Sequence, residues 1–262
     1  MDESVIFRRK SINARLDTVL SAADEDGLPI ARRTVEEPDD RWYGQLVIGA
    51  YNSSGSTTDP EMVLPAAVAT ELLRGYCRLR SRLLIQLTDD RPHSFTLEPT
   101  SALLAGEYLS TSAYSSLRSI DHPALSDCFE VLSSVAETIT EAFTLIKMQP
   151  TPPTSDQCAF FDMTAGSIGA AATVLGAILA DVDGTRRDDL ATVGCGFSTE
   201  RQIRHALDPE SKWAKVAPPA FDEQELRTHA KRRRDEARQA LEELATTANV
   251  GYLRTFTDVE RR

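Results

Sequence analysis

The apolar and polar residues of this chain alternate with the period of α-helices almost throughout. Between Ser4 and Ala23 apolar side chains recur at intervals of three and four residues, and Gly27 then provides a helix stop. The alternation with a period of two that would indicate strands is essentially absent. Helices are predicted over residues 4–23, 42–51, 60–86, 99–120, 125–148, 160–179, 188–207, 223–244 and 251–259. We therefore predict one all-α domain over residues 1–262.

Short polar segments rich in Gly and Pro separate the predicted helices. They are expected to form loops at residues 24–27, 52–60, 89–92, 121–123, 149–155, 181–184 and 208–221. The helix predicted over residues 160–179 is rich in Ala and Gly, and small residues let neighbouring helices approach closely. We expect this helix to lie in the centre of a bundle.

The negative net charge of the chain argues against two classes of binding partner. The net charge is −11 and the sequence pI is about 4.9, so nucleic acid and anionic membranes should be repelled. The basic run at residues 231–234 is short and acids follow it, which is typical of a solvated helix face. Lys occurs only at positions 10, 147, 212, 215 and 231. An acidic, Lys-poor surface fits a high-salt cytoplasm, and an ordinary acidic protein is the alternative.

The cysteines and the apolar runs exclude two further classes. The four cysteines lie far apart without a CxxC pair, so free thiols are expected rather than a zinc site or a disulfide framework. No apolar run reaches the roughly 20 residues of a membrane-spanning helix, and the first residues are polar and charged. We expect a soluble cytoplasmic protein.

Several segments carry the order and spacing of a known family. They are ELLRGYCRLRSRLLIQLTDDR at residues 71–91, ALLAGEYL at 102–109, Thr164-Ala165, LGAILA at 175–180 and RQIRHALD at 201–208. In that order they resemble the trans-isoprenyl diphosphate synthases, or polyprenyl synthetases, from about residue 40 to the end. The resemblance implies a helical bundle of the isoprenoid-synthase type, pairing into a dimer, and a role in isoprenoid metabolism.

The acidic positions of this family are mostly replaced. Its two aspartate-rich motifs hold Mg²⁺, which neutralises the leaving diphosphate. The first motif falls on residues 81–85, which read SRLLI, so all three acids are lost. At the second, Gln202 is retained, His205 and Ala206 stand at the acidic pair, and Asp208 matches the last acid in a register one residue short. The resemblance therefore implies the loss of the usual metal ligands.

Other diphosphate ligands of the family change as well. Its Lys-Thr pair becomes Met163-Thr164, and its GGKxxRP segment falls on residues 38–44, where Arg41 is the remaining cation. Asp89-Asp90 stand where the family has a basic pair and would repel a diphosphate. The candidate substrate-binding residues are Arg41, Arg82, Thr164, Gln202, Arg204 and Asp208. No catalytic residue and no metal ligand is assigned.

Three arginines share one face of the helix predicted over residues 60–86. Arg74, Arg78 and Arg82 follow each other at intervals of four. They would form a metal-free anion site, or pair with carboxylates of this acidic chain or of a partner subunit. Ion pairing is the favoured interpretation. His205 is an acid, a base or a ligand in one interpretation and an ordinary helix histidine in the favoured one.

Two hypotheses for the function follow from these observations. In the first, the chain is a non-catalytic homologue that needs no cofactor, and it pairs with a catalytic prenyl synthase or with itself, or binds an isoprenoid diphosphate. In the alternative, it is an active isoprenyl diphosphate synthase. Its Mg²⁺ would then be held by a rearranged set of residues, drawn from Gln202, Asp208, Glu107 and Asp89-Asp90.

Overall fold

The regular elements of the protein are all helices in the part of the chain that the structure describes. The structure is a computed structural model, and it describes residues 3–37, 40–53, 60–88, 97–147, 154–208 and 222–259. The α-helices are α1 (Glu3–Glu25), α2 (Pro29–Glu36), α3 (Trp42–Asn52), α4 (Pro60–Thr88), α5 (Pro99–Leu117), α6 (Leu125–Lys147), α7 (Thr154–Phe161), α8 (Ser167–Leu179), α9 (Gly184–Leu207), α10 (Glu223–Leu244) and α11 (Gly251–Val259). The π-helical turn η1 (Asp162–Gly166) joins α7 to α8. The predicted all-α fold is confirmed.

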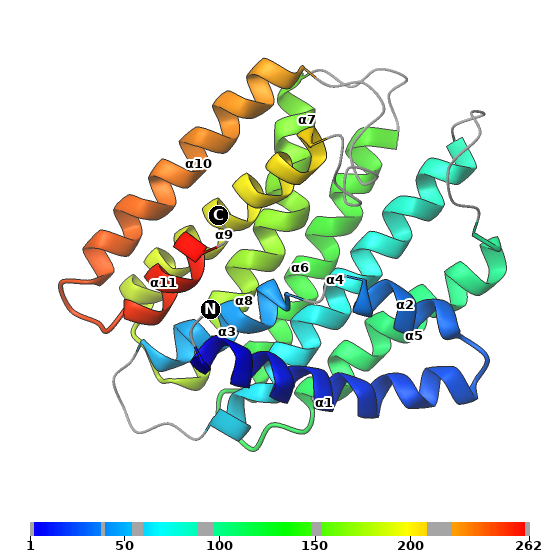
Figure 1. Cartoon of the computed structure of the whole chain (residues 1–262), viewed down its shortest axis with the longest axis horizontal. Coiled ribbons are helices and arrows are strands. Elements are labelled where there is room, and N and C mark those ends of the chain that lie inside the picture. Colours follow the sequence, from blue (N-terminus) through cyan, green and yellow to red (C-terminus); the bar gives the residue numbers. More distant parts are fainter. Residues whose placement is uncertain are drawn as a thin grey trace.

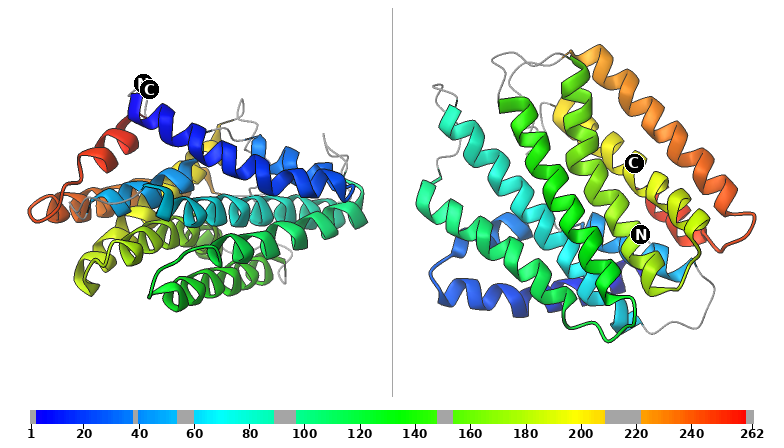
Figure 2. Two further views of the ribbon diagram at one scale, coloured as in Figure 1. Left: turned by 90° about the horizontal axis from the view of Figure 1, so that it is seen from below. Right: turned by 180° about the vertical axis from the view of Figure 1, so that it is seen from behind.

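The long helices form a layered bundle. Figure 1 shows α4, α5, α6, α8, α9 and α10 running side by side, with α1 crossing one face of them. Figure 2 shows α1 on one side of the bundle and α6 on the opposite side. The start of α1 lies beside α11, where the Arg8 guanidinium packs 4.0 Å from the centre of the Tyr252 ring.

Most predicted helix bounds agree with the structure. Gly27 has a φ of +76°, a conformation that only glycine adopts readily, and it ends α1 as predicted. Pro99 opens α5 behind an N-cap formed by Glu98, whose carboxylate accepts from the backbone N–H groups of Thr100 and Ser101. Parts of the predicted loops at residues 52–60, 89–92, 149–155 and 208–221 lie outside the described residues.

Two helical features were not predicted. Helix α2 is only eight residues long, too short to show a clear apolar repeat, and it is held by burying Ala31 and Val35. The helix predicted to begin at Phe160 begins at Thr154 and contains the η1 turn. A π turn inserts an extra residue into a helix and is often found at functional sites.

The small residues of α8 allow the close packing that the composition predicts. A Cβ built on Gly169 would lie 2.2 Å from the Gly194 carbonyl oxygen, and one on Gly194 would lie 2.1 Å from the Gly169 carbonyl oxygen. These distances are far below van der Waals contact, so α8 and α9 cross with their backbones touching. The crossing fixes where η1 and the last turns of α9 lie relative to each other.

One helical stretch is long and apolar enough to cross a membrane, contrary to the prediction. It covers Ser155–Leu179, and 61% of its most apolar window is buried inside the bundle. Burial against neighbouring helices is the ordinary reason for such a composition in the core of a soluble protein. A soluble protein is thus plausible.

Candidate functional site

A small cavity lies among α3, α4, α7, η1, α8 and α9. Its volume is about 50 Å³. Space of this kind holds roughly three to five water molecules. The lining residues are Tyr43, Arg74, Cys77, Arg78, Phe160, Phe161, Thr164, Ala165, Ile168, Arg201, Gln202 and His205. We refer to this space as the arginine cavity.

Three guanidinium groups enter the arginine cavity from two helices. Arg74 and Arg78 come from α4, where a spacing of four residues puts both on one face, and Arg201 comes from α9. The guanidinium of Arg201 packs 4.9 Å from the centre of the Trp42 ring and forms an ion pair with Asp40. The indole N–H of Trp42 donates to Ser198 Oγ at 2.9 Å, which ties α3 to α9 beside this arginine.

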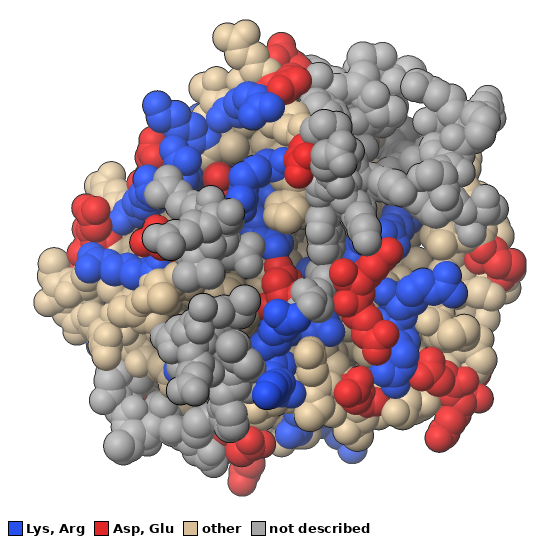
Figure 3. All heavy atoms as spheres, viewed as in Figure 1, with Lys and Arg blue, Asp and Glu red and all other residues tan. Residues whose placement is uncertain are grey.

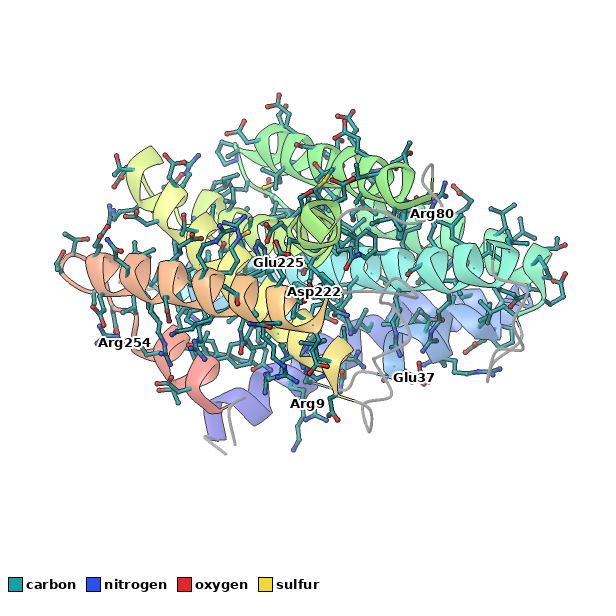
Figure 4. All side chains as sticks on the ribbon, turned by 90° about the horizontal axis from the view of Figure 1, so that it is seen from above. Arg9, Glu37, Arg80, Asp222, Glu225 and Arg254 are labelled. Atoms are coloured by element: carbon teal, nitrogen blue, oxygen red, sulfur yellow. The ribbon has the colours of Figure 1, made fainter. Side chains whose placement is uncertain are left out.

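The arginines of α4 are paired with carboxylates, as the favoured interpretation predicts. Arg74 Nη2 lies 2.7 Å from Glu71 Oε2, inside the same helix. Arg78 and Arg82 both reach Glu37 Oε2, at 2.6 and 2.8 Å. Figure 4 shows Glu37 and Arg80 on opposite sides of α4, so Arg80 belongs to another face.

The C-terminal end of α2 also binds these arginines. Arg41 Nη1 donates to the Val35 carbonyl oxygen at 2.6 Å, and Arg74 Nη2 approaches the same oxygen at 3.4 Å. Arg78 Nη1 donates to the Thr34 carbonyl oxygen at 3.4 Å. The last carbonyls of a helix have no partner within it and carry partial negative charge. Helix α2 therefore positions the cations of the cavity wall.

Positive charge exceeds negative charge around the cavity. The described ion pairs join four guanidiniums, those of Arg74, Arg78, Arg82 and Arg201, to three carboxylates, those of Glu37, Asp40 and Glu71, and the Arg41 guanidinium bonds the Val35 carbonyl oxygen beside them. Figure 3 shows basic side chains gathered near the middle of one face, with acidic side chains between them. The whole chain has a net charge of −11, so this local excess runs against the composition.

The pKa values of the wall residues reflect this environment. Burial lowers the pKa of Arg78 to about 9, and the nearby Arg82 adds to the effect. Burial, together with Arg201 and Arg204, lowers the pKa of His205 to about 4, so this imidazole is neutral at pH 7. Burial alone would raise the pKa of Asp40, but Arg201 and Arg74 hold it below its usual range. The cavity is thus lined by charged arginines and a neutral histidine.

Two of the predicted substrate-binding residues line the cavity. Gln202 lies on α9 next to Arg201. Thr164 lies in η1, and its hydroxyl donates to the Phe160 carbonyl oxygen at 2.6 Å. That bond leaves the lone pairs of the Thr164 oxygen available as acceptors. The π turn therefore gives Thr164 an ordered position in the wall.

The other four predicted residues do not line the cavity. Arg41 is buried at the start of α3, where it bonds Asn13 and the Val35 carbonyl oxygen. The guanidinium of Arg82 is directed to Glu37. The Arg204 side chain is 44% exposed, 3.8 Å from Glu200, and Asp208 is exposed at the C-terminal end of α9. These side chains serve neighbouring groups or face solvent instead.

Sequence reasoning missed Arg201, Tyr43 and the aromatic residues of the cavity. Arg201 directly precedes Gln202, and a cation at that position was the available signal. Tyr43 is fully buried, and burial raises its phenol pKa well above the usual value. Phe160 and Phe161 form an edge-to-face pair with ring centres 5.8 Å apart. The cavity wall therefore contains apolar as well as basic side chains.

A second polar cluster lies at η1, outside the arginine cavity. Asp162 accepts from Thr199 Oγ1 at 3.1 Å, from Arg233 Nε at 2.9 Å and from Arg233 Nη2 at 2.6 Å, and His229 Nε2 lies 3.1 Å from it. Burial alone would raise the pKa of Asp162, but His229 and Arg233 hold it below the usual range. We refer to these four residues as the Asp162 cluster.

Comparison with solved structures identifies the fold. The geranylgeranyl pyrophosphate synthetase of the archaeon Geoglobus acetivorans superposes with a TM-score of 0.76 at 18% identity, over 97% of this chain and 96% of that chain. The geranyltranstransferase of Thermotoga maritima gives 0.74 at 17% identity, over 99% and 97% of the two chains. The chain has the prenyl diphosphate synthase fold.

Sequence comparison adds nothing to the structural likeness. No protein-family model and no curated protein sequence matches the chain. A deletion mutant of the heterotetrameric geranyl pyrophosphate synthase of mint shares the fold with a TM-score of 0.67 at 15% identity, over 92% of this chain and 93% of that one. All these identities are low, so the likeness defines the fold.

The residues of the cavity do not fit the Mg²⁺ that the family resemblance implies. Magnesium prefers carboxylate oxygens and water, and the described cavity wall offers guanidiniums, an imidazole, an amide and hydroxyls instead. The described residues contain no group of three or more His, Cys, Asp or Glu side chains able to hold a metal. Ser81, which stands at the first acid of the family motif, is buried and does not line the described cavity wall.

Proposed function

We propose that this chain is a non-catalytic relative of the prenyl diphosphate synthases and acts as a partner subunit of a catalytic synthase. The observation that carries the proposal is the cavity wall, where guanidiniums stand in place of metal-binding carboxylates. Stabilisation of the departing diphosphate supplies most of the rate of such a reaction, and the described part of this wall carries no carboxylate to hold Mg²⁺ for it. The fold is kept while its chemistry is lost.

A partner role is consistent with the likeness to a heterotetrameric enzyme. The mint geranyl pyrophosphate synthase that shares this fold is heterotetrameric, so the fold takes part in mixed assemblies. The proposed role places the whole chain, as one domain, in the cytoplasm as a soluble subunit of isoprenoid metabolism. Pairing of two copies of this chain is the other assembly that the proposal allows.

The test is co-expression with the catalytic prenyl synthases of the source organism. Size-exclusion chromatography would measure complex formation. Turnover of isopentenyl and allylic diphosphates with Mg²⁺ would be measured for the complex, for the synthase alone and for this chain alone. We expect a stable complex, no turnover by this chain alone, and a changed rate or product length for the complex.

The same assay defines the result against the proposal. Turnover by this chain alone with Mg²⁺ would make it an active synthase with a rearranged site. Loss of that turnover in Asp208→Ala, with Glu107→Ala as the comparison, would then show which carboxylate holds the metal. Both carboxylates are exposed, so both variants should fold.

A further inference from the structure

We propose that α11 is a positioning element for the arginine cavity: docked on α3, it holds the Arg201 guanidinium in the cavity wall through a stack of aromatic rings. The rings are those of Tyr252 and Phe256 on α11 and of Trp42 on α3, and we refer to these three residues as the aromatic ladder. The inference concerns the position of Arg201, so it stands whether or not a catalytic synthase is the partner of the chain.

The aromatic ladder joins a cation of α1 to a cation that lines the cavity. The Arg8 guanidinium packs 4.0 Å from the centre of the Tyr252 ring, and the Tyr252 and Phe256 ring centres are 5.9 Å apart. The Phe256 and Trp42 ring centres are 4.7 Å apart, and the Arg201 guanidinium packs 4.9 Å from the Trp42 ring centre. Ring pairs and cation–ring contacts at these distances are attractive, so the five groups form one continuous stack.

A chain of hydrogen bonds connects the same α11 residue to Arg201. The Tyr252 hydroxyl donates to Gln45 Oε1 at 2.8 Å, and the Gln45 side-chain amide donates to the Asp40 carbonyl oxygen at 2.6 Å. The Asp40 carboxylate forms the ion pair with Arg201. Tyr252 therefore begins two routes to Arg201, one through ring contacts and one through hydrogen bonds.

The inner parts of both routes are buried. Trp42 and Gln45 are 2% exposed and Phe256 is 3% exposed. The Trp42 indole N–H donates to Ser198, which precedes Arg201 by three residues and so lies on the same face of α9. A close-packed interior has few voids, so a displaced ring moves its neighbours. Figure 2 shows α11 and the start of α1 together on one outer side of the bundle, so the ladder leads from that side inward.

The docking of α11 depends on a glycine of α3. A Cβ built on Gly49 would lie 2.6 Å from Leu253 Cδ2 and 2.9 Å from Tyr252 Cδ1. Both distances are below van der Waals contact, and Leu253 is fully buried, so a larger residue at position 49 would push α11 outward. Gly49→Ala therefore displaces α11 without changing any residue of the aromatic ladder.

Two groups of the cavity report where the Arg201 guanidinium lies. After burial, Arg201 is the largest cause that lowers the pKa of His205 to about 4. Cys77 lines the same cavity, and burial raises the pKa of its thiol to about 12, so a thiol reagent should modify it slowly. Withdrawal of Arg201 should raise the pKa of His205 and speed the modification of Cys77.

The experiment measures these two readouts on the full chain. NMR titration would follow the His205 ring, with His205→Gln to assign its signal. Labelling with iodoacetamide, followed by mass spectrometry of the peptides, would give the rate at Cys77. Both readouts concern the folded protein and need no ligand, partner or activity.

Four variants test the two routes. Arg201→Met removes the guanidinium and gives the reference change in both readouts. Gly49→Ala and Phe256→Leu should change both readouts in the same direction, with labelling about threefold faster or more. Tyr252→Phe keeps the ring and loses only the hydrogen bond to Gln45, so it should give a smaller change.

Two controls separate positioning from a general loss of stability. Gly184→Ala adds the same methyl group at the start of α9, where a Cβ meets nothing within 4 Å, so it should match the parent. Cys128 on α6 is fully buried and does not line the described cavity wall, so its labelling rate should stay constant in every variant.

Three results would overturn the inference. They are parent values of both readouts in Gly49→Ala and Phe256→Leu, equal acceleration of labelling at Cys77 and Cys128, and an effect of Gly184→Ala as large as that of Gly49→Ala. The synthase assay fails separately, through turnover by this chain alone, so the two proposals can be rejected one at a time.

Discussion

The Asp162 cluster and the arginine cavity both combine arginines with carboxylates, but they arrange them differently. In the cluster the Asp162 carboxylate accepts from the hydroxyl of Thr199 and from two nitrogens of the Arg233 guanidinium. The imidazole of His229 lies against the same carboxylate. In the cavity guanidiniums outnumber carboxylates, and the Nε of Arg74 has no described acceptor. The Asp162 carboxylate thus has all its described donors around one acceptor, whereas the cavity wall brings several cations to one space.

The difference indicates that the Asp162 cluster has a structural role. The Asp162 cluster joins η1 to α9 and α10, since Thr199 lies on α9 and both His229 and Arg233 lie on α10. A saturated buried carboxylate holds elements together and offers little to a ligand. The arginines at the cavity are held in part by the last carbonyl groups of α2, which accept from Arg41, Arg74 and Arg78. Variants that disturb one site should therefore leave the other unchanged.

The largest expected effect comes from removing the carboxylate of Asp162. Asp162→Ala leaves Arg233 and His229 without their acceptor, and we expect the free energy of unfolding to fall by about 3 kcal/mol. Urea denaturation would measure this loss. The labelling rate of Cys77 in the arginine cavity should stay unchanged. A loss below about 0.5 kcal/mol would show that solvent replaces the carboxylate and that the cluster is not structural.

A smaller effect is expected from Glu71→Gln. The Glu71 side chain is fully buried and accepts from the Gly44 backbone N–H at 2.9 Å, a bond that the amide oxygen can keep. Arg74 loses its charged partner, so we expect a loss of about 2 kcal/mol. Urea denaturation would measure this loss too. Unchanged stability would show that the Val35 carbonyl oxygen is a sufficient partner for Arg74.

The two sites also differ in how far the sequence revealed them. Helix periodicity located α4, α9 and α10, because each is long and presents a repeating apolar face, and the apolar composition located α3, which is buried all round. The spacing of Arg74, Arg78 and Arg82 correctly suggested ion pairs. Their partner Glu37 follows α2, a helix too short for periodicity to reveal, so the partner could not be named.

The same missed helix explains why the sequence could not place the Arg41 side chain. The resemblance placed Arg41 at a diphosphate-binding position, but the end of α2 brings the Val35 carbonyl oxygen against its guanidinium. A helix end with unpaired carbonyls takes the nearest cation. Thr164 and Gln202 were named because each matches a position of the family's motifs, and both line the cavity. Arg201 was missed because the family motif that guided the assignment begins one residue later, at Gln202.

A pH dependence should distinguish the sites further. The pKa of His205 falls to about 4 in the folded protein, and an unfolded histidine titrates near 6.5. Between these values the unfolded chain binds a proton that the folded chain does not, so stability rises with pH across that window. We expect roughly 1 kcal/mol between pH 4.5 and 6.5, since the ring is only half-buried.

His205→Gln is the check on this assignment. Urea midpoints of the parent and the variant should lie closest near pH 7, where the imidazole is neutral in both states, and should separate as the pH falls toward 4.5, where only the parent is destabilised. The Asp162 cluster contributes in a lower window, because its depressed pKa means that stability is lost only as pH falls below about 4. Identical pH profiles for parent and variant would mean that His205 does not carry the dependence.

The smallest effect is expected from replacing Arg204. This variant tests whether an arginine on α9 outside the cavity affects the cavity as much as Arg201 inside it. Its side chain is 44% exposed and lies 3.8 Å from Glu200, so Arg204→Ala should cost less than about 0.5 kcal/mol of stability. Arg204 also helps to lower the pKa of His205, so its removal should raise that pKa slightly. Labelling of Cys77 should remain within about twofold of the parent, because Arg204 does not line the described cavity wall. If Arg204→Ala raised the pKa of His205 as much as Arg201→Met, an arginine at the exposed end of α9 would set that pKa. The position of Arg201 in the cavity would then not be what His205 reports.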